Sequence, residues 1–302
     1  MPQQLSTKIV LPLDFCLTHD SPLATTVFSP SGYRPAMPKT HRLSPKSRIK
    51  LSEISTRGKD FHDDRRQAEK QFHELREELI ALQDCLYAEG RQSLLVVLQA
   101  MDAGGKDGTI RHCTKGVNPQ GVRVASFKKP SSKELSHDFL WRIHRQTPAR
   151  GMIGIFNRSH YEDVLVVRVH NYVPESVWRP RYKRINQFEE HLAEEGTKIV
   201  KIFLHISKEE QKERFQDRLD EPDKHWKFDK DDLNKRELWD DYQLAFQDML
   251  NNCTTDHAPW YVIPGDQKWY RNLAIMQILV DTLKEMNLQY PESDDLSDVV
   301  ID

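Results

Sequence analysis

The sequence predicts an α/β protein: a three-layer α/β/α sandwich in which a parallel five-stranded sheet carries helices on both faces. The prediction rests on short runs of β-branched and aromatic residues and on the helical patterns between them. Strands that alternate with helices pair in parallel through crossover connections, which gives a doubly wound sheet. The five expected strands are LLVVL (94–98), VRVASF (122–127), MIGIF (152–156), KIVKIFLHI (198–206) and WYVIP (260–264).

The expected helices are read from apolar periodicity and from their ends. Between Arg66 and Ala88 apolar residues recur at helical spacing, and Gly90 stops the run. A capping box, in which a serine is followed three residues later by a glutamate, marks the start of two further helices. These capping boxes are Ser131 with Glu134 and Ser207 with Glu210.

Composition along the chain predicts one main domain with two flanking segments. Residues 1–60 are rich in Pro, Ser and Thr and have weak periodicity, which is typical of an extension or a strap over another surface. Residues 61–290 hold the strands and helices of the domain, with a candidate lid at about 207–232. Residues 291–302 form an acidic tail, which we expect to be frayed.

Overall composition excludes several classes of protein. The chain has 302 residues, 30% of them charged, and a net charge of −2, so bulk electrostatics give no reason to expect a nucleic-acid partner. No apolar run approaches membrane-spanning length, and the N-terminus lacks the layout of a signal peptide, so we expect no membrane partner and a cytoplasmic location. Four widely spaced cysteines without metal-ligand pairing agree with free thiols in a reducing compartment. They are Cys16, Cys85, Cys113 and Cys253.

The segment LLVVLQAMDAGGKDGTI (94–110) has the layout of a phosphate-binding loop. A buried strand that ends in glycines and opens a helix directs several backbone N–H groups, and the positive end of the helix dipole, at one point. Gly104, Gly105 and Gly108 allow close approach of the backbone, and Lys106 supplies a mobile positive charge. A tight turn with an incidental lysine is the alternative, but the strand before and the helix after favour phosphate binding.

This loop departs from the standard pattern G-x-x-x-x-G-K-[ST]. Ala100 stands where a glycine is usual, and Asp107 stands where a hydroxyl is usual. Asp102 adds a carboxylate beside the expected phosphates, which is repulsive unless a divalent cation lies between them. Mg²⁺ is usually bound by one or two carboxylates together with substrate phosphates, so Asp102 is a candidate metal ligand. The alternative is that Asp102 or Asp107 caps the following helix.

A second strand ends near the same place. The stretch GMIGIFNRSHYEDVLVVRVH (151–170) begins with an apolar run that finishes at Asn157 and Arg158. Ligands of open α/β sheets bind beyond the carboxyl ends of the strands, so Arg158 is expected to face the same crevice as Lys106. An arginine at a strand end can equally be a surface residue, but the polar residues that follow favour the crevice.

The expected lid is basic. Arg214 and Arg218 lie one helical turn apart on one face, and the basic-aromatic segment DKHWKF that follows holds Lys224 and Lys227. Like charges on one face favour an anionic partner, so the segment is interpreted as a lid whose cations close over phosphates. The alternative is a solvated face paired with nearby Glu213 and Asp217. Three further cations near predicted strand ends are candidates for the same groove: Lys128, Arg142 and Arg168.

With these residues in view, the sequence resembles the polyphosphate kinase 2 family over roughly residues 45–290. The branch called class III is the most similar, on the segment FNRSHYEDV, where other branches have an aspartate before the arginine. No single motif is specific, but together they are. The motifs are MDAGGKDGTI, NPQGVRVASFKKP, HDFLWRIHRQTP, GIFNRSHYEDVLVVRVH, LHISKEEQKERFQDRL and DKHWKF.

The resemblance implies a P-loop kinase-like fold related to thymidylate kinase, with a helical lid. It implies an enzyme that uses Mg²⁺ and inorganic polyphosphate and transfers the terminal phosphoryl group reversibly to a nucleotide. Class III members accept both nucleoside mono- and diphosphates, so AMP, ADP and ATP are the expected nucleotide partners. A homo-oligomer is also expected, of a size that the sequence does not specify.

Matched residue by residue, the resemblance gives Asp102 and Lys106 the roles of the phosphate-binding loop and Arg158 the phosphate contact at the strand end. Asp102 is the only metal ligand that it implies. Asn157 is a departure, because this neutral amide stands where other branches offer a carboxylate to Mg²⁺, and we assign it no metal role. The expected phosphate-binding set is Gly104, Gly105, Lys106, Asp107, Gly108, Thr109, Lys128, Arg142, Arg158, Arg168, Arg214, Arg218, Lys224 and Lys227.

Two other functions remain open on the sequence. An ATP-dependent kinase of nucleotides or sugars would act with ATP and a small acceptor but not with polyphosphate. A non-catalytic polyphosphate-binding protein would bind without turnover and would keep binding after Lys106→Ala. The preferred direction of transfer, the choice between AMP and ADP, and the selectivity for the base are not determined by the sequence.

Overall fold

The computed structural model describes residues 41–45, 47–292, 299 and 301 of the chain. Most of the expected N-terminal extension, residues 1–40, lies outside the described residues. Most of the expected acidic tail also lies outside them.

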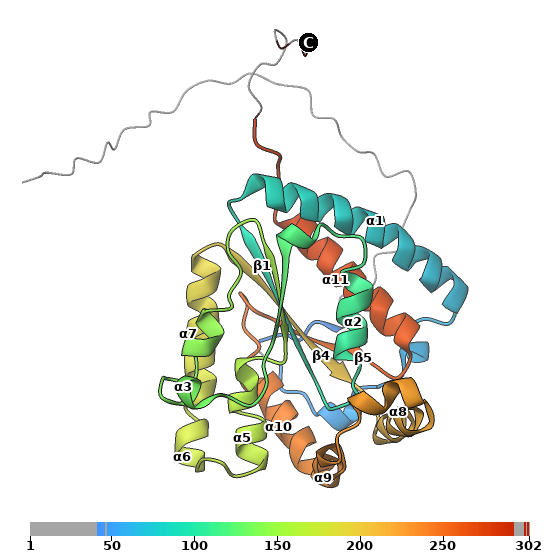
Figure 1. The fold of residues 1–302 in the computed structure, drawn as a ribbon, viewed down its shortest axis with the longest axis vertical. Helices are drawn as coiled ribbons and strands as arrows, with labels where there is room; N and C mark the ends of the chain where they lie inside the picture. The colour runs from blue at the N-terminus through green and yellow to red at the C-terminus, as the bar shows by residue number, and fades with distance from the viewer. Residues whose placement is uncertain (1–40, 46, 293–298, 300, 302) are drawn as a thin grey trace, which may run out of the picture. The chain divides into compact units, whose positions relative to one another are not determined.

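Five parallel strands form the sheet, in the order β2-β3-β1-β4-β5 (Figure 1). Each strand matches one of the five apolar runs to within two residues at either end, so the predicted α/β class is confirmed. β1 is buried along most of its length, as expected of a central strand with neighbours on both sides and helices on both faces. The strands are β1 Ser93–Ala100, β2 Val122–Ser126, β3 Ile153–Asn157, β4 Thr197–His205 and β5 Trp260–Pro264.

The order of the strands creates a switch point beside β1. The chain leaves β1 for the outer strand β2, returns to β3 next to β1, and then crosses to β4 on the other side of β1. Leu98 of β1 lies level with Asn157 of β3 and with Ile202 of β4, so β1 and β3 end at about the same level. Ligands of doubly wound sheets bind beyond the carboxyl ends of the strands at such a point.

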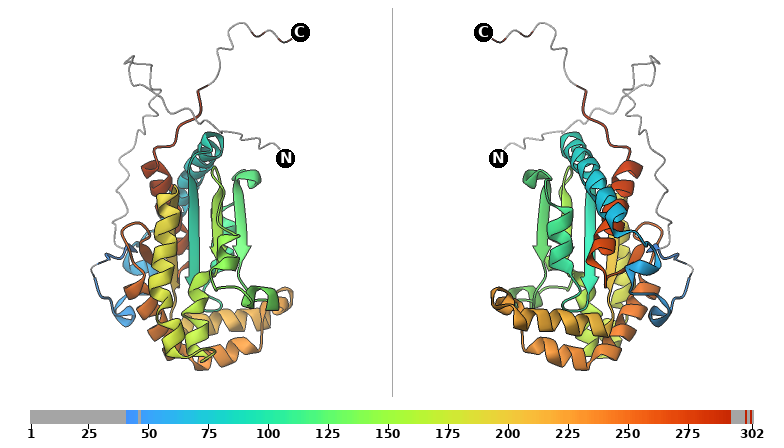
Figure 2. Two further views of the ribbon diagram at one scale, coloured as in Figure 1. Left: turned by 90° about the vertical axis from the view of Figure 1, so that its left-hand side faces the viewer. Right: turned by 90° about the vertical axis from the view of Figure 1, so that its right-hand side faces the viewer.

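Helices cover both faces of this sheet (Figures 1 and 2). One face packs against α1, α2 and α11, and the other against α7 and α10. The short helices α3 to α6 follow β2 and β3, and α8 and α9 lie across the end at which the strands finish (Figure 2). The helices are α1 Arg65–Glu89, α2 Lys106–Cys113, α3 Ser132–Leu135, α4 Trp141–His144, α5 Val166–Val169, α6 Glu175–Trp178, α7 Arg181–Glu194, α8 Lys208–Asp220, α9 Asp231–Glu237, α10 Trp239–Asn252 and α11 Lys268–Glu285.

The ends of α1 follow the sequence expectation. Asp64 caps its first turn by accepting a hydrogen bond from Gln67 N at 2.9 Å. Gly90 ends it in the left-handed conformation, with φ of 65°, which a residue without Cβ adopts at little cost. The capping box of Ser131 and Glu134 is also present, with both reciprocal hydrogen bonds.

The capping box expected at Ser207 is only half formed. Ser207 Oγ accepts from Glu210 N at 3.1 Å, as predicted, but the backbone N–H of Ser207 donates to Asp266 Oδ1 at 2.9 Å. The Glu210 carboxylate instead pairs with Arg214 at 2.8 Å. The prediction was wrong in this half because an arginine one turn along the helix competes for the same carboxylate.

The described part of the expected extension packs against the domain. Leu51 is buried in the core, and Leu43 N donates to Trp260 O of β5 at 2.8 Å. Arg42 forms an antiparallel bridge with Tyr261 of the same strand. Residues 41–43 therefore lie along the outer edge of β5.

Cys85, Cys113 and Cys253 are buried free thiols, in agreement with the expectation from their spacing, and Cys16 lies outside the described residues. Within the part of the chain that the structure describes, no helix combines the length and the apolar character needed to span a bilayer.

Candidate active site

The loop between β1 and α2 depends on two of its glycines for its shape. Gly105 is the residue before α2 and has φ of 99°, and a Cβ at this position would collide with Arg271 Nη1. A Cβ on Gly104 would lie 2.5 Å from Ala100 Cβ and 2.8 Å from Met101 O. A side chain at Gly104 would collide with the loop itself, whereas one at Gly105 would be strained at this φ and would displace the Arg271 side chain. Glycine is therefore favoured at both positions for steric reasons as well as for phosphate access.

Lys106, the first residue of α2, folds back over the loop. Its Nζ donates to Ala100 O at 2.9 Å and to Met101 O at 3.2 Å. Burial and the neighbouring Arg158 lower the pKa of Lys106 to about 8, although Asp102 opposes the shift. The ammonium group is held by neutral carbonyls, so phosphate oxygens would be stronger partners for it.

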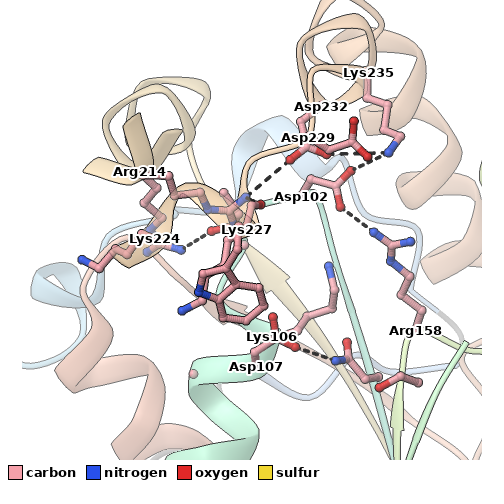
Figure 3. Close-up of a pocket in the computed structure, with 18 of the residues that line it drawn as sticks. Asp102, Lys106, Asp107, Arg158, Arg214, Lys224, Lys227, Asp229, Asp232 and Lys235 are labelled. Carbon is pink, nitrogen blue, oxygen red and sulfur yellow. Dashed lines mark hydrogen bonds and ion pairs between the residues drawn. The ribbon is translucent and has the colours of Figure 1, made fainter. Parts of the chain in front are cut away.

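Asp102 is held by two cations from different parts of the chain (Figure 3). Its Oδ1 accepts from Arg158 Nη2 at 2.6 Å, and its Oδ2 lies 3.3 Å from Lys235 Nζ. Burial alone would raise the pKa of Asp102, but Lys106, Arg158 and Lys235 outweigh burial and bring it to about 2. Asp102 is therefore a carboxylate at every physiological pH.

The alternative role of a helix cap does not fit either carboxylate of the loop. Within the described residues, α2 has no side-chain hydrogen bond at its N-terminus, and Gly105 occupies the capping position. Asp107, in the first turn of α2, instead accepts from Asn157 Nδ2 at 2.7 Å, so the Asn157 amide binds the start of this helix.

Arg158 follows β3 directly and adopts a backbone conformation unusual for a residue with a side chain. Its φ is 62°, in the left-handed region, and its N–H donates to Leu98 O at 3.1 Å. The side chain is about one-third exposed, which leaves it accessible from the crevice. A strained non-glycine residue beside a binding loop is a common feature of functional sites.

The two arginines of α8 lie on the predicted face but are committed to protein groups. Arg214 donates to Ala103 O at 2.9 Å and to Gly265 O at 2.6 Å, so it connects the loop after β1 with the end of β5. Arg218 donates to Lys227 O at 3.0 Å and lies 3.4 Å from Asp232. The alternative of a solvated face paired with Glu213 and Asp217 does not hold for Arg214, which is buried and pairs with Glu210. The acidic partner of Arg218 is Asp232.

The segment after α8 forms a 3₁₀ turn over Pro222–Lys227 and leads into α9. Lys224 is paired with Glu221, and Lys227 Nζ lies 5.0 Å from the centre of the Trp226 ring. Trp226 is 79% exposed, the most exposed tryptophan of the described chain. The name lid is used below for α8, this turn and α9 together, which reach Glu237. The predicted lid at about 207–232 covers most of this segment, and its closing over substrate stays a prediction.

The loop, the strand ends and the lid line an open cavity of about 710 Å³. Its lining, drawn from the described residues, holds ten basic and five acidic side chains, so the cavity carries an excess of positive charge. The lining residues are Asp102, Ala103, Gly104, Gly105, Lys106, Asp107, Gly108, Ser126, Phe127, Lys128, Lys129, Asn157, Arg158, Arg214, Asp217, Arg218, Lys224, Trp226, Lys227, Asp229, Asp232, Lys235 and Lys268.

Three of the expected phosphate-binding residues do not line this cavity. Thr109 is buried inside α2. Arg142 donates to Lys128 O at 2.8 Å and lines a neighbouring hollow, which shares Lys128 with the main cavity. Arg168 is paired with Asp248 at 2.7 Å and lines a separate hollow beside α5 and α10. The structure brings the remaining expected residues together.

The structure also adds residues that the sequence reasoning missed. Lys235 of α9 contacts Asp102, and Asp232 lies 3.7 Å from the same lysine. Burial and the charge of Asp102 raise the pKa of Asp232 to about 6. Arg271 of α11 is buried behind Gly105, and burial together with Arg214 lowers its pKa to about 10. In the sequence, Lys235 is marked only by its helical spacing of three and four residues from Asp232 and Asp231.

The residues present fit a magnesium ion that is completed by substrate. Among the described residues, no group of three His, Cys, Asp or Glu side chains is arranged to hold a metal without help. Mg²⁺ needs fewer protein ligands than this, since one or two carboxylates and substrate phosphates commonly suffice. Asp102, ionised and facing the cavity, supplies one such carboxylate, and Asp232 lies across Lys235 from it.

A glycine-rich loop between strand and helix, a lysine at its end, an arginine after the neighbouring strand and a cationic lid are the parts of a phosphate-transferring enzyme. Fold and site therefore define a P-loop-type kinase.

Comparison with known proteins identifies the family of kinases to which the chain belongs. The family model of polyphosphate kinase 2 (PPK2) matches residues 62–291, and the chain belongs to this family. It is 51% identical over 264 residues to an AMP/ADP-polyphosphate phosphotransferase of Meiothermus ruber, covering 87% of this chain and 99% of that protein. It is 44% identical over 271 residues to an ADP-polyphosphate phosphotransferase of Rhodopseudomonas palustris, covering 84% and 92%.

A solved structure agrees with this assignment. The crystal structure of polyphosphate kinase 2 from Arthrobacter aurescens superposes with a TM-score of 0.82 at 41% sequence identity, covering 85% of this chain and 92% of that one. The resemblance seen in the sequence motifs and the P-loop kinase-like fold that it implied are therefore both confirmed.

Proposed function

We propose that the protein transfers the terminal phosphoryl group of inorganic polyphosphate to ADP and to AMP, reversibly and with Mg²⁺. The observation that carries this proposal is the cationic cavity, which extends from the loop after β1 to the lid. The names of the Meiothermus and Rhodopseudomonas relatives support polyphosphate as donor and adenine nucleotides as acceptors.

The geometry of the cavity favours a long anionic donor. Lys106 and Arg158 lie at the strand ends, whereas Lys224 and Lys227 lie on the lid, so cations are available at several separate positions. A chain of phosphates carries about one negative charge per unit and can contact such positions in succession, whereas a single phosphate group cannot.

The proposed reaction is an in-line displacement. A terminal phosphate oxygen of the nucleotide attacks the terminal phosphorus of polyphosphate, and the bond from that phosphorus to the bridging oxygen breaks. The nucleotide gains one phosphoryl group, and polyphosphate leaves one unit shorter with the bridging oxygen as its new terminus. No side chain need act as a strong base, because the attacking oxygen is already anionic.

The protein's own residues orient the groups and neutralise their charge. Lys106 would leave its backbone carbonyls to bind phosphate oxygens, and Arg158 would stabilise the charge of the transferring group from the end of β3. Backbone N–H groups of the glycine loop would bind the phosphate to be transferred. When bound at Asp102, Mg²⁺ would supply charge neutralisation and geometric restraint of the phosphates.

One assay tests the proposal. The purified protein is incubated with Mg²⁺, polyphosphate and either AMP or ADP, and nucleotide products are separated by chromatography. We expect ADP and ATP to form from AMP, and ATP from ADP. Activity with ATP and a small acceptor but none with polyphosphate would favour an ATP-dependent kinase. Binding of polyphosphate without turnover would favour a non-catalytic protein.

Formation of a homo-oligomer stays a prediction.

A further inference from the structure

A fully buried ionic network lies on the α7 face of the sheet, outside the cavity. Lys201 of β4 has no exposed surface, and its Nζ makes three hydrogen bonds. It donates to Glu189 Oε2 at 2.5 Å, to the Tyr161 hydroxyl at 2.8 Å and to Cys253 O at 2.6 Å. The network therefore joins four separate segments of the chain.

The carboxylate of Glu189, on α7, is the centre of this network. Its Oε1 accepts from the Tyr161 hydroxyl at 2.7 Å and lies 3.0 Å from His160 Nε2. Burial alone would raise the pKa of Glu189, but Lys201 and His160 outweigh burial and keep it below the usual range. Glu189 is therefore charged, and it has a partner on each oxygen.

Such a network is a poor way to stabilise a core. Removing two charges from water costs more than their attraction often returns, and apolar residues of similar volume commonly serve as well or better. Aromatic rings of the core lie beside the network: the Trp260 ring centre is 5.3 Å from Lys201 Nζ, and the Phe188 ring centre is 5.8 Å from that of His160. Unlike apolar packing, a hydrogen-bonded network fixes the position and orientation of the chain segments that carry its groups.

The segment that this network fixes is the one that carries Arg158. His160 and Tyr161 belong to the 3₁₀ turn His160–Asp163, which begins two residues after Arg158. Arg158 itself is anchored on the other side by its N–H bond to Leu98 O at 3.1 Å. Its left-handed φ of 62° is unfavourable for a residue with a side chain, so both anchors are needed to hold it.

We propose that Glu189, charged and held by Lys201, is a positioning residue that keeps the His160–Asp163 turn in place and thereby directs Arg158 into the cavity. The inference rests on the proposed function, because it assumes that Arg158 acts on the transferring phosphoryl group. Glu189 is not among the residues that line the cavity, and its hydrogen-bond partners in the described part of the chain are His160, Tyr161 and Lys201. An effect of Glu189 on the reaction would therefore pass through the turn.

The test replaces the network without leaving a buried charge alone. The double variant Glu189→Gln with Lys201→Met keeps approximate volume and removes both charges, and such exchanges preserve folding in other buried pairs. We expect its kcat to fall about 10- to 100-fold, the scale of a displacement of about 1 Å at a reacting group, with little change in the KM for nucleotide. Leu192→Ala, in the core on the same helix, is the matched control for lost stability.

Coupling to Arg158 decides whether the effect passes through that residue. We expect the double variant to lower kcat in the wild-type background but to have no further effect in an Arg158→Ala background, because interacting sites are not additive. A fall in kcat by the same factor in the wild-type and Arg158→Ala backgrounds would overturn the proposal. So would an unchanged kcat in the double variant, or an equal fall in Leu192→Ala.

Two safeguards separate the possible failures. If the double variant does not fold, Tyr161→Phe removes one hydroxyl and keeps the ring in the core, and the same cycle with Arg158→Ala is measured on it. If Arg158→Ala alone retains normal turnover, the proposed role of Arg158 fails, and this inference fails with it. If Arg158→Ala loses turnover but its effect and that of the Glu189/Lys201 double variant on kcat are additive, only this inference fails.

Discussion

Lys235 Nζ, on the lid, lies 3.3 Å from Asp102 Oδ2, on the loop after β1. The other oxygen of Asp102 is bonded to Arg158, so both sides of the carboxylate are occupied by protein cations. Each carboxylate oxygen can accept more than one partner, so a metal ion on Asp102 would either share the carboxylate with these cations or displace one of them. The contact places the lid and the candidate metal ligand Asp102 in one ion-pair network.

Asp102→Asn is expected to abolish metal-dependent turnover while the protein stays folded. The amide keeps the shape of the side chain but loses the charge that attracts a divalent cation. The measurement is the initial rate as a function of Mg²⁺ concentration. Asp107→Asn, in the same loop, is the matched control and should have a smaller effect. If Asp102→Asn keeps the wild-type dependence on Mg²⁺, Asp102 is no metal ligand.

The free enzyme should lose activity as the pH rises above about 8. The pKa of Lys106 is lowered from 10.5 to about 8, so the ammonium is present below this pH and lost above it. We expect kcat/KM, which reports the free enzyme, to decline through this range, and kcat to decline only at higher pH because bound phosphate raises the pKa.

Replacement of Lys106 separates its charge from other titrating groups. In Lys106→Arg the guanidinium stays charged, so any remaining activity should lack the decline near pH 8. Lys106→Met should lower turnover by roughly 10³–10⁵-fold, the scale measured for an arginine that neutralises a transferring phosphoryl group. A decline near pH 8 that persists in Lys106→Arg would assign it to another group.

Arg218→Ala is expected to raise the KM for polyphosphate more than the KM for nucleotide, with a larger effect on longer chains. Arg218 holds the backbone of Lys227, so its loss removes one cation from the cavity and loosens another. Steady-state kinetics with short and long polyphosphates at several salt concentrations provide the measurement, because exposed charges are screened beyond about 8–10 Å. Lys212→Ala, exposed on the same helix outside the cavity lining, is the control. Equal KM values in Arg218→Ala and wild type at every chain length would refute contact along the chain.

Gly105→Ala should lower turnover, because alanine is strained at a φ of 99° and its Cβ would displace the Arg271 side chain behind the loop. Gly196→Ala is the control that has the strain of a positive φ without a contact to Arg271. Gly196 has φ of 87°, but its Cβ would meet Arg91 O only at 3.8 Å, far from the cavity. It should lose about 1–2 kcal/mol of stability, seen by calorimetry, and keep normal turnover. Normal turnover in Gly105→Ala would show that the site tolerates a displaced Arg271 side chain.

The fold was predictable because its signals are local. The runs that became β1 to β5 are short and strongly apolar, and Gly90 and Ser131 mark helix ends through interactions within a few residues. The loop at 101–108 was predictable for the same reason, since its function depends on the strand before it and the helix after it.

The partners of the charged residues were not predictable in the same way. Helical spacing places Arg214 and Arg218 on one face, but it does not reveal that carbonyl groups of Ala103 and Gly265 lie against that face. Lys235 was missed because its contact with Asp102 spans more than 130 residues of chain. Arg168 follows a strand in sequence but turns toward Asp248, which a position near a strand end cannot indicate.

The contact of residues 41–43 with β5 has a practical consequence for protein engineering. An uncovered strand at the border of a sheet is a template for pairing with other chains and hence for aggregation. Leu43 and Arg42 occupy the free side of Trp260 and Tyr261. A shortened protein that begins at residue 41 would keep this protection, whereas one that begins at residue 47 would expose the strand and is expected to precipitate more readily on expression.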